Sequence, residues 1–273
     1  MRCSVSVRLA LLSAAALLFA SAAAKAEDKW GAVEGQVTWN GGAVPAPAPA
    51  NVDKDQAVCL KNGPILKQDF VVNPKNKGVR WAVVWLVDED PKKELPINPA
   101  LASQAAVKGT KVVLDQPCCQ FEPHIICLRE GQVLVAKNSG TIAHNTKIDS
   151  PGDNPSMNPL IPAGTEQSID GWKAASAPSL VGCSIHGWMT GYIRVFNSPY
   201  FAVTDEDGKF KIDKAPAGKY RIVAWQESVG YLNKGFKKGQ PIDIKADGVT
   251  DVNFEVKPKA AAAAAPAAPA PQP

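Results

Sequence analysis

Residues 183–196 read CSIHGWMTGYIRVF, and this stretch carries the strongest signal in the chain. Within it, Cys183, His186 and Met189 are each separated by two residues, in a turn that leads into an apolar strand pattern. A further histidine, His144, stands upstream. A thiolate, two imidazoles and a thioether form the ligand set of a blue-copper centre, because soft sulfurs hold Cu(I) and imidazoles suit both oxidation states. The pattern therefore predicts a copper site.

Short strand patterns dominate the chain on both sides of this stretch. Residues 33–39 alternate between apolar and polar side chains and end at the turn sequence Asn40-Gly41-Gly42. Similar runs lie at 81–87, 111–114, 124–128, 132–137, 191–196, 201–204, 209–212, 219–225, 242–244 and 252–256. Many short strands separated by Gly and Pro predict an all-β sandwich or barrel. Residues 96–108 leave room for one short helix, and 149–164 read as a long loop.

Two segments together resemble the cupredoxins, the family of plastocyanin, pseudoazurin, halocyanin and amicyanin. The first contains Phe121-Glu122-Pro123, Gly131, Val133, Asn138 and His144-Asn145, and the second contains Cys183, His186, Met189 and Gly191. The similarity spans residues 115–196, with a long insertion between the segments. The Cys-x-x-His-x-x-Met spacing is most similar to that of amicyanin. The resemblance implies a Greek-key barrel or sandwich.

The resemblance also implies one type 1 copper ion and a function. His144, Cys183 and His186 would be the near-trigonal ligands, and Met189 the weak axial ligand. Asn145 would hydrogen-bond around the thiolate and hold the two ligand loops together. His186 would lie near the surface, its edge serving as the electron port, with partners docking on the apolar surface around it. Such a protein carries single electrons between a periplasmic donor and acceptor and is not an enzyme.

Each candidate residue also has a purely structural interpretation. Cys183 could form a disulfide or a buried thiol, and Met189 could simply pack in the core. Met157 is expected to pack in its loop, and Trp188 beside the site. His124 begins a strand at a position that is not normally a ligand in the family, so a structural role is favoured over a second copper site or a proton-linked role.

The remaining cysteines suggest a disulfide. If Cys183 binds copper, the four others outside the N-terminal leader are Cys59, Cys118, Cys119 and Cys127, and they allow three pairings in an oxidising compartment. A bridge between the neighbours Cys118 and Cys119 would be strained, so Cys59 is expected to pair with one of them. We choose Cys59–Cys119, which would staple the inserted segment to the barrel. The alternative is a zinc or extra copper cluster of Cys118, Cys119 and Cys127 with His124.

A second block begins near Tyr200 and has a resemblance of its own. Residues 203–210 read VTDEDGKF and residues 216–220 read PAGKY, which looks like the carboxypeptidase regulatory-like, or carbohydrate-binding-like, β-sandwich module. This motif is mostly turn chemistry, because Asp-Gly makes a hairpin and Pro-Ala-Gly makes the next corner. We therefore favour a turn over a calcium site for Asp205 and Asp207, which lack the rest of an EF-hand loop.

Composition and motifs divide the chain into five parts. We interpret residues 1–26 as a signal peptide, 27–110 as a β segment, 111–198 as the copper region, 199–257 as the module and 258–273 as an Ala/Pro tail. The β segment either belongs to the copper region or completes the later sandwich, because modules of the second kind usually begin with such a strand. The sequence leaves both arrangements open.

The N-terminus predicts export to the periplasm or outside the cell. A positive start precedes an apolar run at 9–20 that is too short to span a bilayer, and Ala24-Lys25-Ala26 fits a cleavage site. A membrane anchor is the alternative; after cleavage no membrane span remains. Cleavage would lower the formal net charge from +4 to +1, because 30 basic residues become 27 against 26 acidic residues. No clustered basic stripe is present, so no nucleic-acid partner is expected.

Two other classes of function compete with electron transfer. In one, the β module binds envelope glycan as a scaffold and the copper site is secondary or degenerate. In the other, the protein is a copper carrier that releases its ion readily. Some classes are excluded outright: the chain has only three histidines, too few for a multicopper oxidase, and it lacks the common Gly-rich nucleotide cradles.

Overall fold

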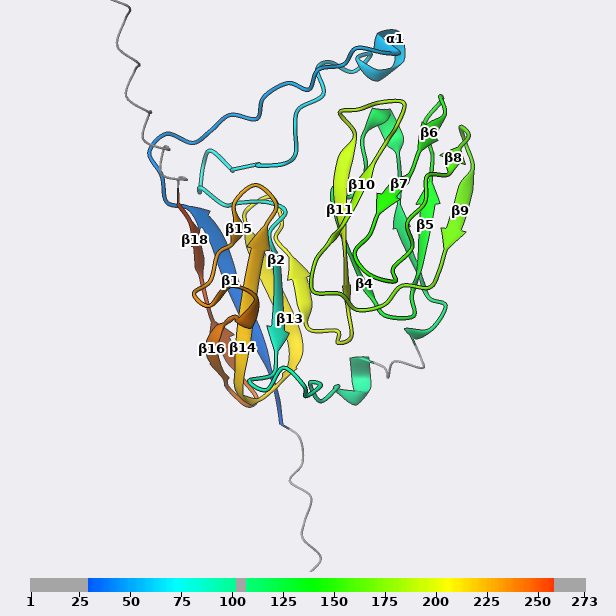
Figure 1. Ribbon diagram of the computed structural model, residues 1–273. Coiled ribbons are helices and arrows are strands. Elements are labelled where there is room, and N and C mark those ends of the chain that lie inside the picture. The colour runs from blue at the N-terminus through cyan, green and yellow to red at the C-terminus, as the bar shows by residue number, and fades with distance from the viewer. Residues whose placement is uncertain (1–28, 102–106, 258–273) are drawn as a thin grey trace, which may run out of the picture.

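A computed structural model describes residues 29–101 and 107–257; the segments interpreted as a signal peptide and a tail lie outside them. Strands make up nearly all the regular structure, in two β-sandwiches that lie side by side (Figure 1). This confirms the all-β prediction. Across the described ranges, no helix is both long and apolar enough to cross a bilayer.

The central sandwich is built from the middle of the chain. Its strands are β3 (Lys111–Leu114), β4 (Ile125–Arg129), β5 (Val133–Lys137), β6 (His144–Asn145), β7 (Lys147–Asp149), β8 (Leu160–Ile161), β9 (Glu166–Ile169), β10 (Ser179–Gly182) and β11 (Thr190–Phe196). One sheet has the order β4-β11-β10-β7, another β3-β5-β9, and β6 pairs with β8. Alternate residues of both larger sheets, such as Leu134 and Ile193, fill the core.

The split sandwich takes strands from both sides of the central one. They are β1 (Trp30–Trp39), β2 (Val83–Val87), β12 (Phe201–Val203), β13 (Lys209–Pro216), β14 (Gly218–Gln226), β15 (Gly230–Tyr231), β16 (Gln240–Ile244), β17 (Val249–Asp251) and β18 (Phe254–Val256). One sheet has the order β13-β1-β17 with β18 also on β1, and the other β12-β2-β14-β15 with β16 on β14. Strands β1 and β2, from the front of the chain, thus lie between strands from its end.

Strand β2 is buried on both faces, which explains its apolar sequence. Val84 and Leu86 point into the core of the split sandwich, whereas Val83 and Trp85 pack in a cluster with Ile125 of the central sandwich. Side chains alternate across a strand, so a strand covered on both sides needs apolar residues at every position. The run at 81–87 is therefore a buried strand, as predicted.

The turn chemistry of the later block is also confirmed. The carboxylate of Asp205 accepts hydrogen bonds from the backbone N–H groups of Asp207 (2.9 Å) and Lys209 (2.8 Å), and Gly208 adopts a φ of 72°. That carboxylate therefore stabilises the hairpin turn.

One loop expectation needs adjustment. The loop expected at 149–164 contains the short strand β8, which the sequence hides because it has only two residues and is flanked by prolines. The described part of 96–108, where one short helix was expected, contains the 3-10 turn η1 (Pro99–Leu101) and a helical residue at Val107. Two further 3-10 turns are η2 (Pro117–Cys119) and η3 (Phe236–Lys238).

A long loop leaves the split sandwich and crosses over the end of the central one (Figure 1). We name its residues 48–67 the strap. Its two arms are joined where the Ala50 N–H donates to the Ile65 carbonyl (2.8 Å), and its tip carries the short helix α1 (Gln56–Cys59). A disulfide joins Cys59 to Cys119, as predicted. The strap is thus attached covalently to the central sandwich.

Candidate metal centre

Three side chains from two loops meet beneath the strap. His144 opens β6, Cys183 follows the last residue of β10, and His186 lies in the turn that leads to β11. Antiparallel pairing of β10 with both β7 and β11 brings these chain segments to one end of the sandwich. In the sequence, His144 lies 39 positions before Cys183 and 42 positions before His186. The pairing of the strands brings the three residues together.

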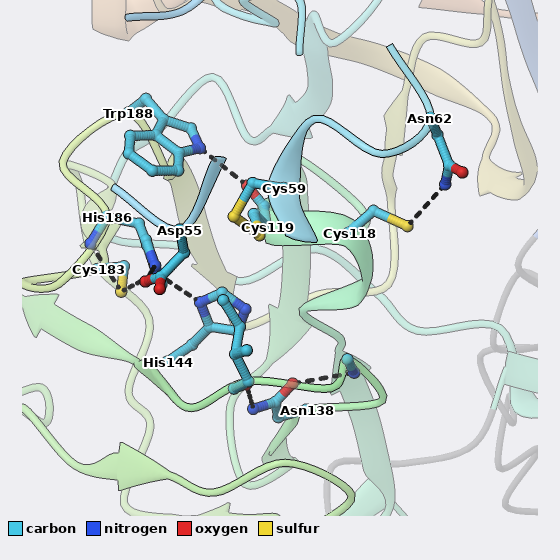
Figure 2. Close-up of a disulfide and its surroundings, with 12 residues drawn as sticks. Asp55, Cys59, Asn62, Cys118, Cys119, Asn138, His144, Cys183, His186 and Trp188 are labelled. Carbon is cyan, nitrogen blue, oxygen red and sulfur yellow. Dashed lines mark hydrogen bonds and ion pairs between the residues drawn. A yellow bond between two sulfur atoms is a disulfide. The ribbon is translucent and has the colours of Figure 1, made fainter. Parts of the chain in front are cut away.

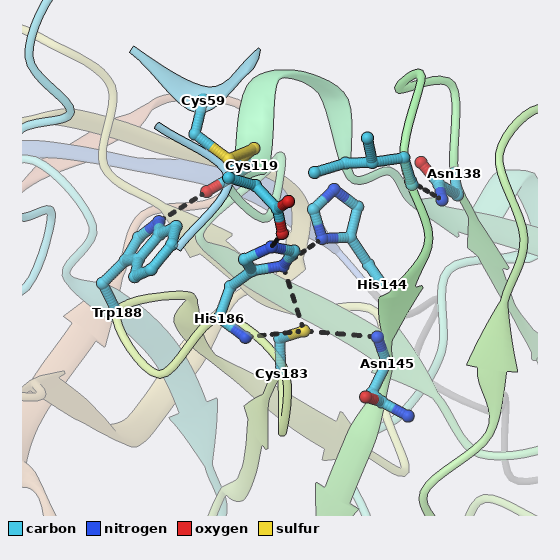
Figure 3. A network of polar contacts seen from close by, with 10 residues as sticks. Cys59, Cys119, Asn138, His144, Asn145, Cys183, His186 and Trp188 are labelled. Carbon is cyan, nitrogen blue, oxygen red and sulfur yellow. Dashed lines mark hydrogen bonds and ion pairs between the residues drawn. A yellow bond between two sulfur atoms is a disulfide. The ribbon is translucent and has the colours of Figure 1, made fainter. Parts of the chain in front are cut away.

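The donor atoms of these residues converge (Figure 3). The Nδ1 atoms of His144 and His186 lie 2.8 Å apart, and the Cys183 Sγ lies 3.7 Å from the His186 Nδ1. All three donors fall within 4.8 Å of one another. The side chains are buried, with exposed fractions of 1%, 0% and 6% for His144, His186 and Cys183. This is the geometry of a small metal pocket closed to bulk water.

Two backbone groups fix the position of the cysteine sulfur. It accepts hydrogen bonds from the backbone N–H of Asn145 (3.2 Å) and from the backbone N–H of His186 (3.4 Å). These two donors hold the sulfur in place at the pocket, and a thiolate is the form in which a cysteine binds a metal. Asn145 therefore links the two ligand loops, and its main chain makes the contact with the sulfur.

His144 is held in its neutral form. Burial, together with the neighbouring His186, lowers its pKa to about 4, although Asp55 acts in the opposite direction. A neutral imidazole has a free lone pair, as metal binding requires. The loop that carries His144 is braced by the buried Asn138, whose amide donates to the carbonyls of Ile142 and Ile161, both at 2.8 Å.

Met189 is placed in the same core, at the end of the second ligand loop. Its side chain is 2% exposed and packs in the cluster that contains Cys183. The loop is closed by backbone bonds from the Cys183 N–H to the Met189 carbonyl (3.2 Å) and from the Met189 N–H to the His186 carbonyl (2.9 Å). An axial role for the Met189 sulfur stays a prediction. Met157 is 37% exposed and forms a bridge with Ile148, so it belongs to its loop.

The expectation that His186 lies near the surface is wrong. Its ring is fully buried, because the strap covers it. The His186 Nε2 lies 2.9 Å from the Asp55 Oδ2, and the ring of Trp188 packs beside it with centroids 5.0 Å apart (Figure 2). Sequence reasoning missed Asp55, which is 131 residues away and belongs to no motif.

The other candidate residues lie outside this pocket. His124 is buried at the contact between the two sandwiches, where it pairs with Glu227 and packs near Trp81, with ring centroids 6.0 Å apart. The alternative zinc or extra copper cluster loses one of its ligands, because Cys119 is in the disulfide. In the described ranges, the remaining free thiols are those of Cys118, Cys127 and Cys183.

The residues of the pocket fit a copper ion. Two imidazole nitrogens that face each other across 2.8 Å need a shared proton or a metal between them, and the adjacent sulfur adds a soft donor. In the described residues, this is the one group of His, Cys, Asp and Glu side chains arranged to hold a metal. Two nitrogens and a thiolate favour copper over hard cations such as magnesium or calcium.

Neither a protein-family model nor a curated protein sequence matches the chain. Solved structures that it is partly similar to include a Cu-containing nitrite reductase from Thermus scotoductus (22% identity, TM-score 0.31), covering 37% of this chain and 27% of that enzyme. Another is a purple cupredoxin from Nitrosopumilus maritimus (16% identity, TM-score 0.27). The similarity covers 31% of this chain and 99% of that protein. A third is amicyanin from Paracoccus versutus (16% identity, TM-score 0.28), where the similarity covers 41% of this chain and 97% of amicyanin. These neighbours are cupredoxins at low identity and partial coverage, and the chain spans about a quarter of the reductase.

Proposed function

We propose that this chain is a type 1 copper protein that carries single electrons between periplasmic redox proteins. The observation that supports this most is the convergence of the His144 Nδ1, His186 Nδ1 and Cys183 Sγ in one buried pocket. A copper ion bound there would supply a one-electron Cu(I)/Cu(II) couple. Met189 would add its thioether sulfur to the residues that hold the ion, and catalysis is not part of the proposed role.

The protein's contribution is to hold its donors still. The three donors stand on β6 and on the turn between β10 and β11 of a single sandwich. The sulfur is fixed further by the two backbone N–H groups of Asn145 and His186. Rigid, buried donors change little when the charge of the ion changes, so little reorganisation accompanies electron transfer. The same burial supports a carrier of electrons over a carrier of copper, because the strap must open before the ion can leave.

Electrons need a path to the surface, and we infer that it passes through Trp188. This ring lies 5.0 Å from that of His186 and is only partly buried. It lines a cavity of about 470 Å³ together with His124, Met189 and Thr190 and the inner side of the strap. A redox partner would therefore dock over Trp188.

A copper titration tests the proposed function. Mature protein titrated with Cu(II) is expected to develop an intense blue charge-transfer band that saturates at one equivalent, because the Cys183 thiolate would be a direct ligand. Cys183→Ser should lose the band. Cys118→Ser is the matched control, since Cys118 is an exposed free thiol, and it should keep the band. A colourless wild-type protein, or a band that survives Cys183→Ser, would contradict the proposal.

A further inference from the structure

The second ring nitrogen of His186 is held by a carboxylate. The distance from its Nε2 to the Asp55 Oδ2 is 2.9 Å (Figure 2). The histidine ring is fully buried, whereas 48% of the Asp55 side chain is exposed. Asp55 therefore lies at the boundary between the pocket and solvent, on the side opposite to the Cys183 sulfur.

The backbone of Asp55 directs the side chain to this position. Asp55 precedes α1 and adopts the left-handed conformation, with φ 47° and ψ 33°. An aspartate at the start of a helix ordinarily caps the first N–H groups, yet the Asp55 side chain makes no such bond. Its carboxylate is engaged with His186 instead, in a backbone conformation that a residue with a Cβ adopts at some cost.

The strap is anchored close to this contact. Cys59, four residues after Asp55, forms the disulfide with Cys119, and the Trp188 Nε1–H donates to the Cys119 carbonyl at 3.1 Å. Val52 and Ile65 of the same strap are buried in the core of the central sandwich. The carboxylate thus meets His186 from a segment fixed on both sides.

The contact determines which nitrogen of His186 can bind a metal. A carboxylate can only accept a hydrogen bond, so the proton of the ring sits on Nε2. The lone pair is then on Nδ1, the atom that faces His144 and Cys183. A carboxylate behind a metal-binding histidine fixes the ring and makes its free nitrogen more basic.

We propose that Asp55 is a positioning residue that fixes the ring of His186 and, through its negative charge, favours Cu(II) over Cu(I). This inference rests on the proposed copper function. A negative charge close to the pocket stabilises the more highly charged ion, so the reduction potential is held lower than the three donors alone would set it.

The test compares the reduction potentials of three copper-loaded variants. Asp55→Asn keeps the size and an acceptor oxygen but removes the charge, and Asp55→Glu restores the charge. Asp53→Asn is the matched control, because Asp53 is exposed two residues away on the same strap and the net charge changes equally. We expect Asp55→Asn to raise the potential by about 59 mV, a change of about tenfold in the ratio of reduced to oxidised protein. Asp53→Asn should shift it much less, and Asp55→Glu should recover part of the change.

The possible results distinguish a failure of the role of Asp55 from a failure of the proposed copper function. A wild-type protein without a blue band would overturn the proposed function. A normal band with equal shifts in Asp55→Asn and Asp53→Asn would overturn the role of Asp55 alone. A second measurement needs no metal: ¹⁵N imidazole NMR of the metal-free protein should find the His186 proton on Nε2 in the wild type. A proton fixed on Nδ1 would contradict the proposal.

Discussion

Trp188 shows how much a single residue does in this site. Its indole N–H bonds to Cys119, which ties the ligand loop to the disulfide, and its ring packs on His186. Because the strap covers His186 itself, Trp188 is the aromatic group that connects the pocket to the cavity beside it. Under the proposed function, Trp188 therefore replaces the edge of His186 as the expected port for electrons.

Replacing Trp188 should slow electron exchange without abolishing copper binding. In Trp188→Leu, we expect self-exchange, measured by NMR line broadening in mixtures of oxidised and reduced protein, to fall by at least about tenfold, which corresponds to about 1.4 kcal/mol of barrier. Trp188→Phe retains a ring and should stay close to wild type. If the leucine variant exchanges as fast as the wild type, the port lies elsewhere.

At the scale of elements, the strap is the feature that distinguishes this sandwich. It contributes Val52, Cys59 and Ile65 to the central core and carries Asp55 over the pocket. Its disulfide joins residues that are 60 positions apart, so it removes much of the freedom of the unfolded chain. The strap thus adds stability and closes the site.

Removal of the disulfide should therefore weaken both properties. For Cys59→Ser combined with Cys119→Ser, we expect a loss of about 2–4 kcal/mol in the free energy of unfolding, measured by urea denaturation. Copper should also pass faster to a chelator, because the strap opens more often. The matched control is Cys118→Ser, an exposed cysteine next to the bridge, with little effect expected. If copper passes to the chelator at the same rate from the double variant and from the wild type, the strap does not close the pocket.

At the scale of the whole molecule, the two sandwiches share a buried cluster of apolar side chains. Arg194 of β11 is 2% exposed, and its guanidinium lies 4.5 Å from the ring centroid of Trp85 in β2 and 5.9 Å from that of Trp225 in β14. Stacking a cation on aromatic faces compensates part of the cost of its burial. Together with the His124–Glu227 pair, these contacts make the split sandwich a support for the sheet that carries Cys183.

The strand pairing predicts that the later block cannot fold alone. In a fragment of residues 199–257, β13 would lack β1 and β14 would lack β2, the partners on which their registers depend. We expect such a fragment to show a disordered circular dichroism spectrum and poor amide dispersion in NMR, whereas residues 27–257 fold cooperatively. Cooperative melting of the fragment would contradict this prediction.

Local sequence patterns were enough to predict most of the strands and the candidate metal ligands. Alternating patterns, turn residues and the Cys-x-x-His-x-x-Met spacing are local, so they can be recognised without knowing what packs against them. Poor geometry argued against a bridge between the neighbours Cys118 and Cys119 and left Cys59 with either of them as its partner; the choice of Cys119 is confirmed by the disulfide in the structure. Strands such as β6 and β8 were missed because two residues carry no periodicity.

The surroundings of the site could not be predicted from local sequence and became visible in the folded chain. The burial of His186, the contact with Asp55 and the place of β1 and β2 in the later sandwich all join segments far apart in sequence. Nothing near His186 in the chain reveals that a strap will cover it, and an isolated aspartate has no pattern to mark it. Such contacts arise because sheet pairing and a disulfide bring distant segments together, and local sequence does not record which segments meet.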